Sequence, residues 1–286
     1  MKSDDDLKHF ALHGAAPLPA AVDEGFVDND GARIAWSTYG AGSQPVMGQP
    51  VMGQPVMGQP VVLLHGGLGH RGNWGYQVPA LVDAGYRAIL IDSRGHGRST
   101  RDARPYSYER MASDVLAVLD ALHVQKAAFV GWSDGACTAL DLARRAPERV
   151  AGVFFFACNM DPGGAKEFVP TPVIERCFKR HREDYEALSA TPDDFDAFVA
   201  AVSEMQRTQP NYSADDLARI GVRVVVAIGE DDEFIRQEHA AYLAQTIPDA
   251  ELIVLPNVSH FAPLQRPALF NGVIERFAGT VFEPDE

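Results

Sequence analysis

Six short apolar runs, separated by segments of helical periodicity, constrain the fold of this chain more than any other feature of its sequence. Each run is rich in β-branched or aromatic side chains. The runs cover residues 61–64, 87–91, 127–131, 150–156, 222–228 and 251–255. They lack polar alternation, which is typical of strands covered on both faces. Because segments with helical spacing separate them, we predict an α/β fold: a mostly parallel sheet with helices on both faces.

The segment between the strands predicted at 150–156 and 222–228 is too long for a simple connection. It spans about 65 residues and contains helical patterns of its own around 163–186 and 192–207. We therefore expect residues 159–212 to form a helical cap inserted into the sheet domain.

The remaining predicted core comprises residues 23–158 and 213–282. It begins with two short strands around an Asn-Asp-Gly turn at 29–31. Residues 1–22 are polar, small and proline-bearing, and predict a flexible lead-in. The segment 44–60 repeats the pentapeptide Gln-Pro-Val-Met-Gly. This unit is too short to carry its own core, and its proline and glycine favour a surface loop.

Charge and cysteine content exclude several classes of protein. The chain has 39 acidic and 25 basic residues, a net charge of −14, so a nucleic-acid-binding surface is not expected. Three cysteines without CxxC spacing predict neither a disulfide framework nor a zinc site. With no signal-peptide pattern and no apolar run of about 18 residues, we expect a cytoplasmic protein without a membrane span. Nothing in the sequence indicates an oligomeric state.

A Gly-x-Ser-x-Gly motif follows the strand predicted at 127–131, with Ser133 at its centre. Small flanking residues permit a sharp turn that would expose the serine. A serine hydroxyl is a weak nucleophile and needs a base held by an acid. Acidic residues follow the next strand at 229–233, and His260 follows the last. Both positions are carboxyl ends of strands, where the sites of open α/β sheets gather.

A second glycine motif suggests a different function. Residues 67–72 fit the Gly-x-Gly-x-x-Gly fingerprint of dinucleotide-binding proteins, and Asp92 lies 20 residues further on, where a ribose-binding acid would be placed. However, Asn-Trp-Gly at 73–75 follows the last glycine, so a helix does not begin at the phosphate turn. The sequence therefore favours the serine-centred site over an NAD-dependent enzyme.

Together these motifs resemble the α/β-hydrolase superfamily, from about residue 24 to 280 apart from the pentapeptide insertion. The matching segments are 65–67 (His-Gly-Gly), 92–99, 131–135, 229–232 and 259–261. The resemblance implies the α/β-hydrolase fold, with Ser133 as nucleophile and His260 as base. In the family the acid usually lies three residues after the glycine that ends its strand, which is Asp232; Asp231 is the alternative.

The resemblance also implies how a substrate is held. Backbone N–H groups of Gly67 and Asp134 would form the oxyanion hole, with Leu68 as the neighbouring alternative to Gly67. Side chains of Asp134, Trp132, Leu68 and Phe261 are candidate substrate contacts, although the aromatic ones could equally be core. No metal or cofactor is required.

The Trp-Ser-Asp-Gly form of the motif resembles that of the biphenyl-hydrolase-like proteins, which include valacyclovir hydrolase. There the acid after the serine is linked to amine-bearing acyl groups. Asp134 could therefore favour positively charged substrates, or its side chain could simply cap the following helix.

We expect a serine hydrolase that cleaves a small-molecule carboxylic ester, or a related lactone or amide, through an acyl-enzyme. A cofactor-free perhydrolase or lyase, or a non-catalytic ligand receptor on the same fold, is the alternative. The serine nucleophile argues against dehalogenase and epoxide hydrolase chemistry, for which relatives use aspartate.

Overall fold

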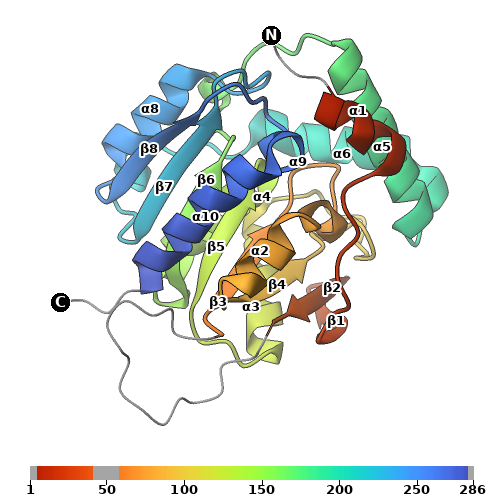
Figure 1. The fold of residues 1–286 in the computed structure, drawn as a ribbon, viewed down its shortest axis with the longest axis horizontal. Coiled ribbons are helices and arrows are strands. Elements are labelled where there is room, and N and C mark those ends of the chain that lie inside the picture. The colour runs from red at the N-terminus through yellow and green to blue at the C-terminus, as the bar shows by residue number, and fades with distance from the viewer. Residues whose placement is uncertain (1–4, 41–57, 283–286) are drawn as a thin grey trace.

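One eight-stranded sheet forms the centre of the molecule in the computed structural model, which describes residues 5–40 and 58–282 (Figure 1). The strands are β1 (Asp23–Asn29), β2 (Ala32–Tyr39), β3 (Pro60–Leu64), β4 (Arg87–Ile91), β5 (Ala127–Trp132), β6 (Val150–Phe156), β7 (Arg223–Gly229) and β8 (Ala250–Leu255). They lie in the order β1-β2-β4-β3-β5-β6-β7-β8. Only β1 with β2 and β2 with β4 pair antiparallel, whereas the other neighbours pair parallel. This confirms the predicted mostly parallel sheet.

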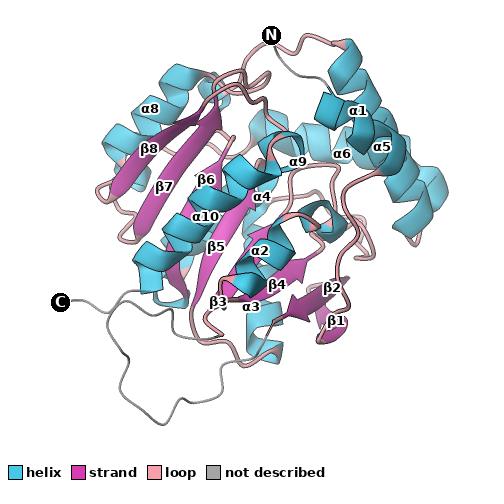
Figure 2. Cartoon of the chain, viewed as in Figure 1, coloured by secondary structure: helices cyan, strands magenta, loops and turns pink. Residues whose placement is uncertain are grey.

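Helices cover both faces of this sheet (Figure 2). The helices of the described residues are α1 (Asp5–His13), α2 (Gln77–Asp83), α3 (Tyr108–Ala121), α4 (Asp134–Arg145), α5 (Pro172–Leu188), α6 (Phe195–Thr208), α7 (Ala214–Leu217), α8 (Gln237–Thr246), α9 (Ala262–Gln265) and α10 (Pro267–Phe282). Side chains of α3, α4 and α8 belong to one buried cluster, and those of α2, α9 and α10 belong to the other.

Strand β3 shows why the apolar runs are continuous. Val62 and Leu64 pack into the cluster on the α3–α4 side, while Val61 and Leu63 pack into the cluster on the α2–α10 side. All four side chains are buried. Successive residues of a strand point to opposite faces, so both kinds of position must be apolar when helices cover both sides.

The structure corrects the flexible lead-in predicted at residues 1–22, because the described part of this segment contains a packed helix. Leu7 and Phe10 on α1 are each 2% exposed and belong to the cluster of the α2–α10 face. Helix α1 contacts both α5 and α9 (Figure 1). The two side chains are three residues apart and form a short apolar stripe on one face of the helix. The polar residues around them kept this stripe from being recognised in the sequence.

Helix α5 begins later than the helical pattern around 163–186 predicts. Thr171 is its N-cap, with a side-chain oxygen that accepts the Ile174 N–H at 3.2 Å. Pro172 occupies the first turn, where its missing N–H costs no hydrogen bond. Residues 163–171 therefore lie outside α5. The first two of them end the 3-10 turn η3 (Pro162–Gly164).

Of the pentapeptide-repeat loop predicted at 44–60, residues 44–57 lie outside the described residues. In the part of the chain that the structure covers, no helix has the length and apolarity needed to cross a bilayer. Among those same residues, no three His, Cys, Asp or Glu side chains are grouped so as to hold a metal ion.

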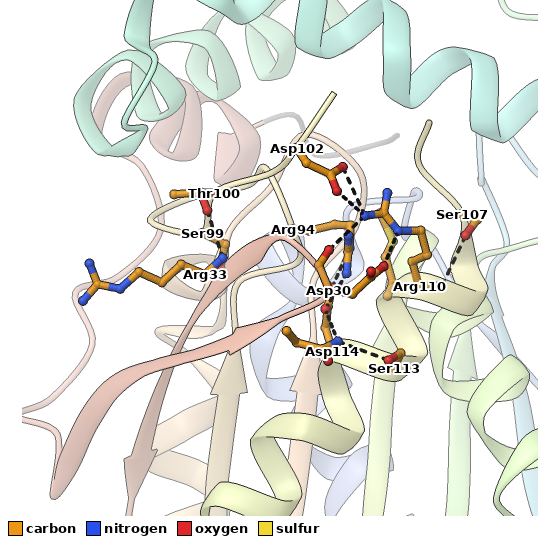
Figure 3. Close-up of polar contacts among 12 residues, drawn as sticks. Asp30, Arg33, Arg94, Ser99, Thr100, Asp102, Ser107, Arg110, Ser113 and Asp114 are labelled. Carbon is orange, nitrogen blue, oxygen red and sulfur yellow. Dashed lines mark hydrogen bonds and ion pairs between the residues drawn. The ribbon is translucent and has the colours of Figure 1, made fainter. Parts of the chain in front are cut away.

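A buried ion pair anchors the loop that follows β4. Arg94 donates from Nε and Nη2 to the two carboxylate oxygens of Asp114 on α3, at 2.7 and 2.6 Å (Figure 3). Both side chains are 1% exposed. Asn29 donates to the same carboxylate at 2.8 Å, so the pair also holds the β1–β2 hairpin. A buried charge left without its partner is costly, so each member of the pair depends on the other.

We predict that Asp114→Ala destabilises the protein by about 3–5 kcal/mol, because it leaves the Arg94 guanidinium buried and unpaired. Asp120→Ala on the same helix is the matched control: the Asp120 side chain is 66% exposed and pairs with Arg149. Its removal should cost at most about 1 kcal/mol. Urea unfolding of both variants measures the difference, and equal costs would contradict the prediction.

Candidate active site

Ser133 lies in a tight turn between β5 and α4. Its backbone adopts φ 54° and ψ −122°, a strained conformation for a residue other than glycine. Gly135 makes the turn possible, because a Cβ at that position would lie 2.1 Å from the backbone oxygen of Leu64 on β3. The close contact between α4 and the carboxyl end of β3 therefore requires the second glycine of the motif.

His260 and Asp232 meet beyond the ends of β8 and β7. His260 Nδ1 lies 3.0 Å from Asp232 Oδ2, and both residues are buried. The other oxygen, Oδ1, accepts the backbone N–H groups of Phe234 and Ile235, each at 2.8 Å. The carboxylate is thereby fixed in orientation, and of the two candidate acids it is Asp232 that contacts the imidazole.

Several carboxylates surround the imidazole of His260. Burial by itself lowers the pKa of His260, but the charge and hydrogen bond of Asp232, with the charges of Glu233 and Asp134, outweigh it and raise the pKa above its usual value. Glu233 contributes through geometry as well, because its Oε2 accepts the backbone N–H of His260 at 3.0 Å. Burial raises the pKa of Glu233 in turn.

A pocket of about 570 Å³ lies beside Ser133 and His260. Ser133 and His260 line it, as do all the predicted substrate and oxyanion-hole residues: Gly67, Leu68, Trp132, Asp134 and Phe261. Trp132 and Phe261 are each 3% exposed and pack edge to face with ring centroids 5.9 Å apart. They are therefore part of the core as well as the pocket wall.

The loop before Gly67 is held by His65. Its Nε2 accepts the Ser93 N–H at 3.0 Å, and its Nδ1 lies 2.8 Å from the Gly66 carbonyl oxygen. A carbonyl only accepts, so Nδ1 carries the proton and the ring is neutral. Burial lowers the pKa of His65 to about 4, in agreement with this tautomer.

The Asp92 carboxylate binds backbone N–H groups of this chain, which differs from the ribose binding that the Gly-x-Gly-x-x-Gly motif suggests. It is 1% exposed, and its two oxygens accept the backbone N–H groups of Arg71 and Arg98 at 2.7 and 3.0 Å. The residues after Gly69 form the 3-10 turn η1 (Arg71–Trp74) rather than a long helix. This carboxylate therefore braces two loops beside the pocket.

Asp134 is not the N-cap of α4, a position that Ser133 holds. The carboxylate instead accepts the Tyr108 hydroxyl at 2.8 Å and the Gln206 amide at 3.0 Å. Both donors are neutral, and burial raises the pKa of Asp134. Gly67 lies against it, since a Cβ there would be 2.6 Å from Asp134 Oδ2.

Sequence reasoning did not identify several residues that line the pocket. Tyr108 and Gln206 come from α3 and α6, and no local pattern links either of them to Asp134. Lys166 donates to the Asp232 backbone oxygen at 2.6 Å. The aromatic residues Phe168, Phe178 and Phe234 also line the pocket. Only Phe234 carried a signal, because it follows the predicted acid by two positions.

Comparison with known proteins agrees with this architecture. Residues 61–273 match the alpha/beta hydrolase family. The chain is 30% identical over 247 residues to 2-hydroxy-6-oxo-6-phenylhexa-2,4-dienoate hydrolase of Comamonas testosteroni, covering 73% of this chain and 84% of that relative.

Two solved structures share the fold. A meta-cleavage product hydrolase from Pseudomonas fluorescens IP01 aligns with a TM-score of 0.71 at 22% identity, covering 87% of this chain and 95% of that one. Est816, described as an N-acyl homoserine lactone degrading enzyme, aligns with a TM-score of 0.65 at 29% identity, covering 88% and 100%.

We predict that Glu233→Gln lowers the pKa of His260, because the amide can keep the backbone hydrogen bond while a negative charge beside the imidazole is lost. An NMR titration of His260 measures the shift without depending on catalysis. Glu230→Gln is the control, since the Glu230 carboxylate accepts the Asn257 N–H at an exposed position. An unchanged pKa in Glu233→Gln would show that this charge does not act on His260.

Proposed function

The chain belongs to the alpha/beta hydrolase family and is a hydrolase; on that premise we propose that it cleaves a small carboxylic ester, or a related lactone or amide, through an acyl-enzyme. One observation carries the proposal: Ser133 on its strained turn lines the same pocket as His260, whose Nδ1 lies 3.0 Å from Asp232. Nucleophile, base and orienting acid are the parts that acyl transfer needs.

In the proposed reaction, His260 Nε2 removes the Ser133 proton as the hydroxyl oxygen attacks the substrate carbonyl. The Asp232 carboxylate accepts from Nδ1, which leaves Nε2 free to act as the base. The imidazolium then gives its proton to the leaving oxygen as the C–O bond breaks. Water, deprotonated by the same histidine, attacks the acyl-enzyme and releases the acid.

Backbone N–H groups of Gly67 and Asp134 are proposed to bind the developing oxyanion. Each such donor is worth about 3 kcal/mol of barrier. Asp134 opens α4, so its N–H belongs to the first turn of a helix, where N–H groups are unused by the helix itself. Gly67 lies in the loop held by His65, and Leu68 next to it has φ 63°.

Asp134 is proposed to select the acyl group. A buried carboxylate that has only neutral hydrogen-bond donors attracts a positively charged or hydrogen-bond-donating substrate group. It would repel a carboxylate-bearing substrate such as the dienoate in the name of the Comamonas relative. This charge therefore favours substrates without a carboxylate over the dienoate in that relative's name.

We propose that residues 159–212 act as a cap over the site, in agreement with the pocket lining. Lys166 and Phe168 come from the segment before α5, and Gln206 comes from α6. Residues 159–222, which include this segment, carry a net charge of −5 (seven basic and twelve acidic side chains), which would weakly favour cationic substrates.

Ser133→Ala should reduce hydrolysis of short p-nitrophenyl esters by at least about a thousandfold, since the attacking oxygen is lost. In the wild type, kcat/KM should rise with pH through the pKa of His260, because only the neutral imidazole accepts the serine proton. Steady-state kinetics across pH, with circular dichroism of the variant as a folding control, tests both statements. Absence of serine-dependent hydrolysis would favour the lyase or receptor alternatives.

Asp134→Asn should reduce the preference for an amino-acid ester over its deaminated analogue by about 10- to 100-fold, the worth of a charged hydrogen bond. The asparagine oxygen can still accept from Tyr108, so the pocket wall is kept. The ratio of the two kcat/KM values is the measurement. The same ratio in both enzymes would exclude a role for this charge in specificity.

A further inference from the structure

Three phenylalanine rings form a stack that starts at the imidazole of His260. Phe234 packs edge-on against His260, with ring centroids 4.7 Å apart. Phe168 lies nearly parallel to Phe234, at 6.2 Å and 15°. Phe178 continues the stack from Phe168, at 6.1 Å and 2°. These separations fall in the range of offset-parallel aromatic contacts.

The outer rings of the stack are unusually accessible for their size. Phe168 is 52% exposed and Phe178 is 36% exposed, although both line the pocket. Exposed aromatic surface gathered at one side of a pocket is typical of a ligand-binding wall, because a bound apolar group would remove that surface from water. A flat ring would also gain stacking contacts that a saturated group cannot make.

The position of the stack relates it to one part of the substrate. In acyl transfer the imidazolium donates its proton to the leaving group, so the leaving group lies beside the histidine. The stack begins at His260. The Asp134 carboxylate, by contrast, contacts Tyr108 and Gln206 and lies against Gly67.

We propose that Phe168, Phe178 and Phe234 form a leaving-group subsite for a planar aromatic alcohol, so that the substrates are arylmethyl or similar aromatic esters. This inference rests on the proposed function. When the ester C–O bond breaks, the acyl carbon stays on Ser133 Oγ and the alcohol oxygen takes the proton from His260 Nε2. The products after hydrolysis are a carboxylic acid and the aromatic alcohol.

Benzyl and cyclohexylmethyl esters of one acid test the subsite, because their alcohols have similar acidity and size but differ in aromaticity. The wild type should prefer the benzyl ester in kcat/KM, and the double variant Phe168→Leu/Phe178→Leu should reduce that preference about 3- to 10-fold. Phe26→Leu is the matched control. Phe26 is 43% exposed on β1, under the Arg33 guanidinium, and does not line the pocket.

A binding measurement separates failure of the subsite from failure of the reaction. Saturation-transfer NMR with benzyl alcohol and cyclohexylmethanol on Ser133→Ala should show stronger binding of the aromatic alcohol, lost in the added double variant. Serine-dependent hydrolysis with an unchanged benzyl preference in the double variant would overturn the subsite alone. If no serine-dependent hydrolysis is found, the proposed function fails, and equal binding of the two alcohols then overturns the subsite as well.

Discussion

The turn at Ser133 is the constraint on which the site depends. Helix α4 starts so close to the sheet that Gly135 has no room for a Cβ against the Leu64 carbonyl. That contact places the first turn of the helix beside the loop following β3, which carries Gly67. The strained serine and the loop glycine therefore share one pocket wall. A bulkier residue at position 135 would separate the two elements and remove both contributions together.

Fixed hydrogen bonds determine the remaining geometry. Asp232 uses one oxygen for two backbone N–H groups and the other for His260, so its orientation does not rely on the ligand. His65 and Asp92 hold the loop of Gly67 in the same manner. Neutral imidazole is required at His65, because its Nε2 accepts a backbone N–H. The polar groups of the site are thus arranged before substrate binds, which is how an enzyme avoids paying for reorganisation during reaction.

The two carboxylates of the candidate site have contrasting surroundings. Asp232 faces an imidazole and two backbone donors, whereas Asp134 faces a phenol hydroxyl and an amide. Burial disfavours charge at Asp134 and raises its pKa. Together with the exposed aromatic rings on the other part of the wall, this gives the pocket two chemically distinct regions. An amphipathic, small-molecule substrate fits such a division.

Local pattern predicted the sheet and its covering helices, because the period of apolar side chains depends on residues near one another in the chain. Ser133, the acidic segment 229–233 and His260 were marked separately, each by its place after a predicted strand, and their joint role stays a proposal. Helix α1 was not predicted, because two apolar side chains in a polar segment do not indicate a helix by themselves. They are buried only because α5 and α9 provide a surface for α1 to pack against. The start of α5 was misplaced because its Thr171 cap outweighs helical spacing upstream.

The sequence by itself determined the strand–helix alternation and the candidate residues of the site. Only the tertiary structure decided that Asp232 rather than Asp231 contacts His260, that Asp134 is held by Tyr108 and Gln206, and that three phenylalanines stack beside the imidazole. These hydrogen bonds and ring contacts form over a few ångströms between residues that are far apart in the chain, 72 positions in the case of Gln206 and Asp134. Such distances are set by how elements pack, which no local pattern of residues encodes.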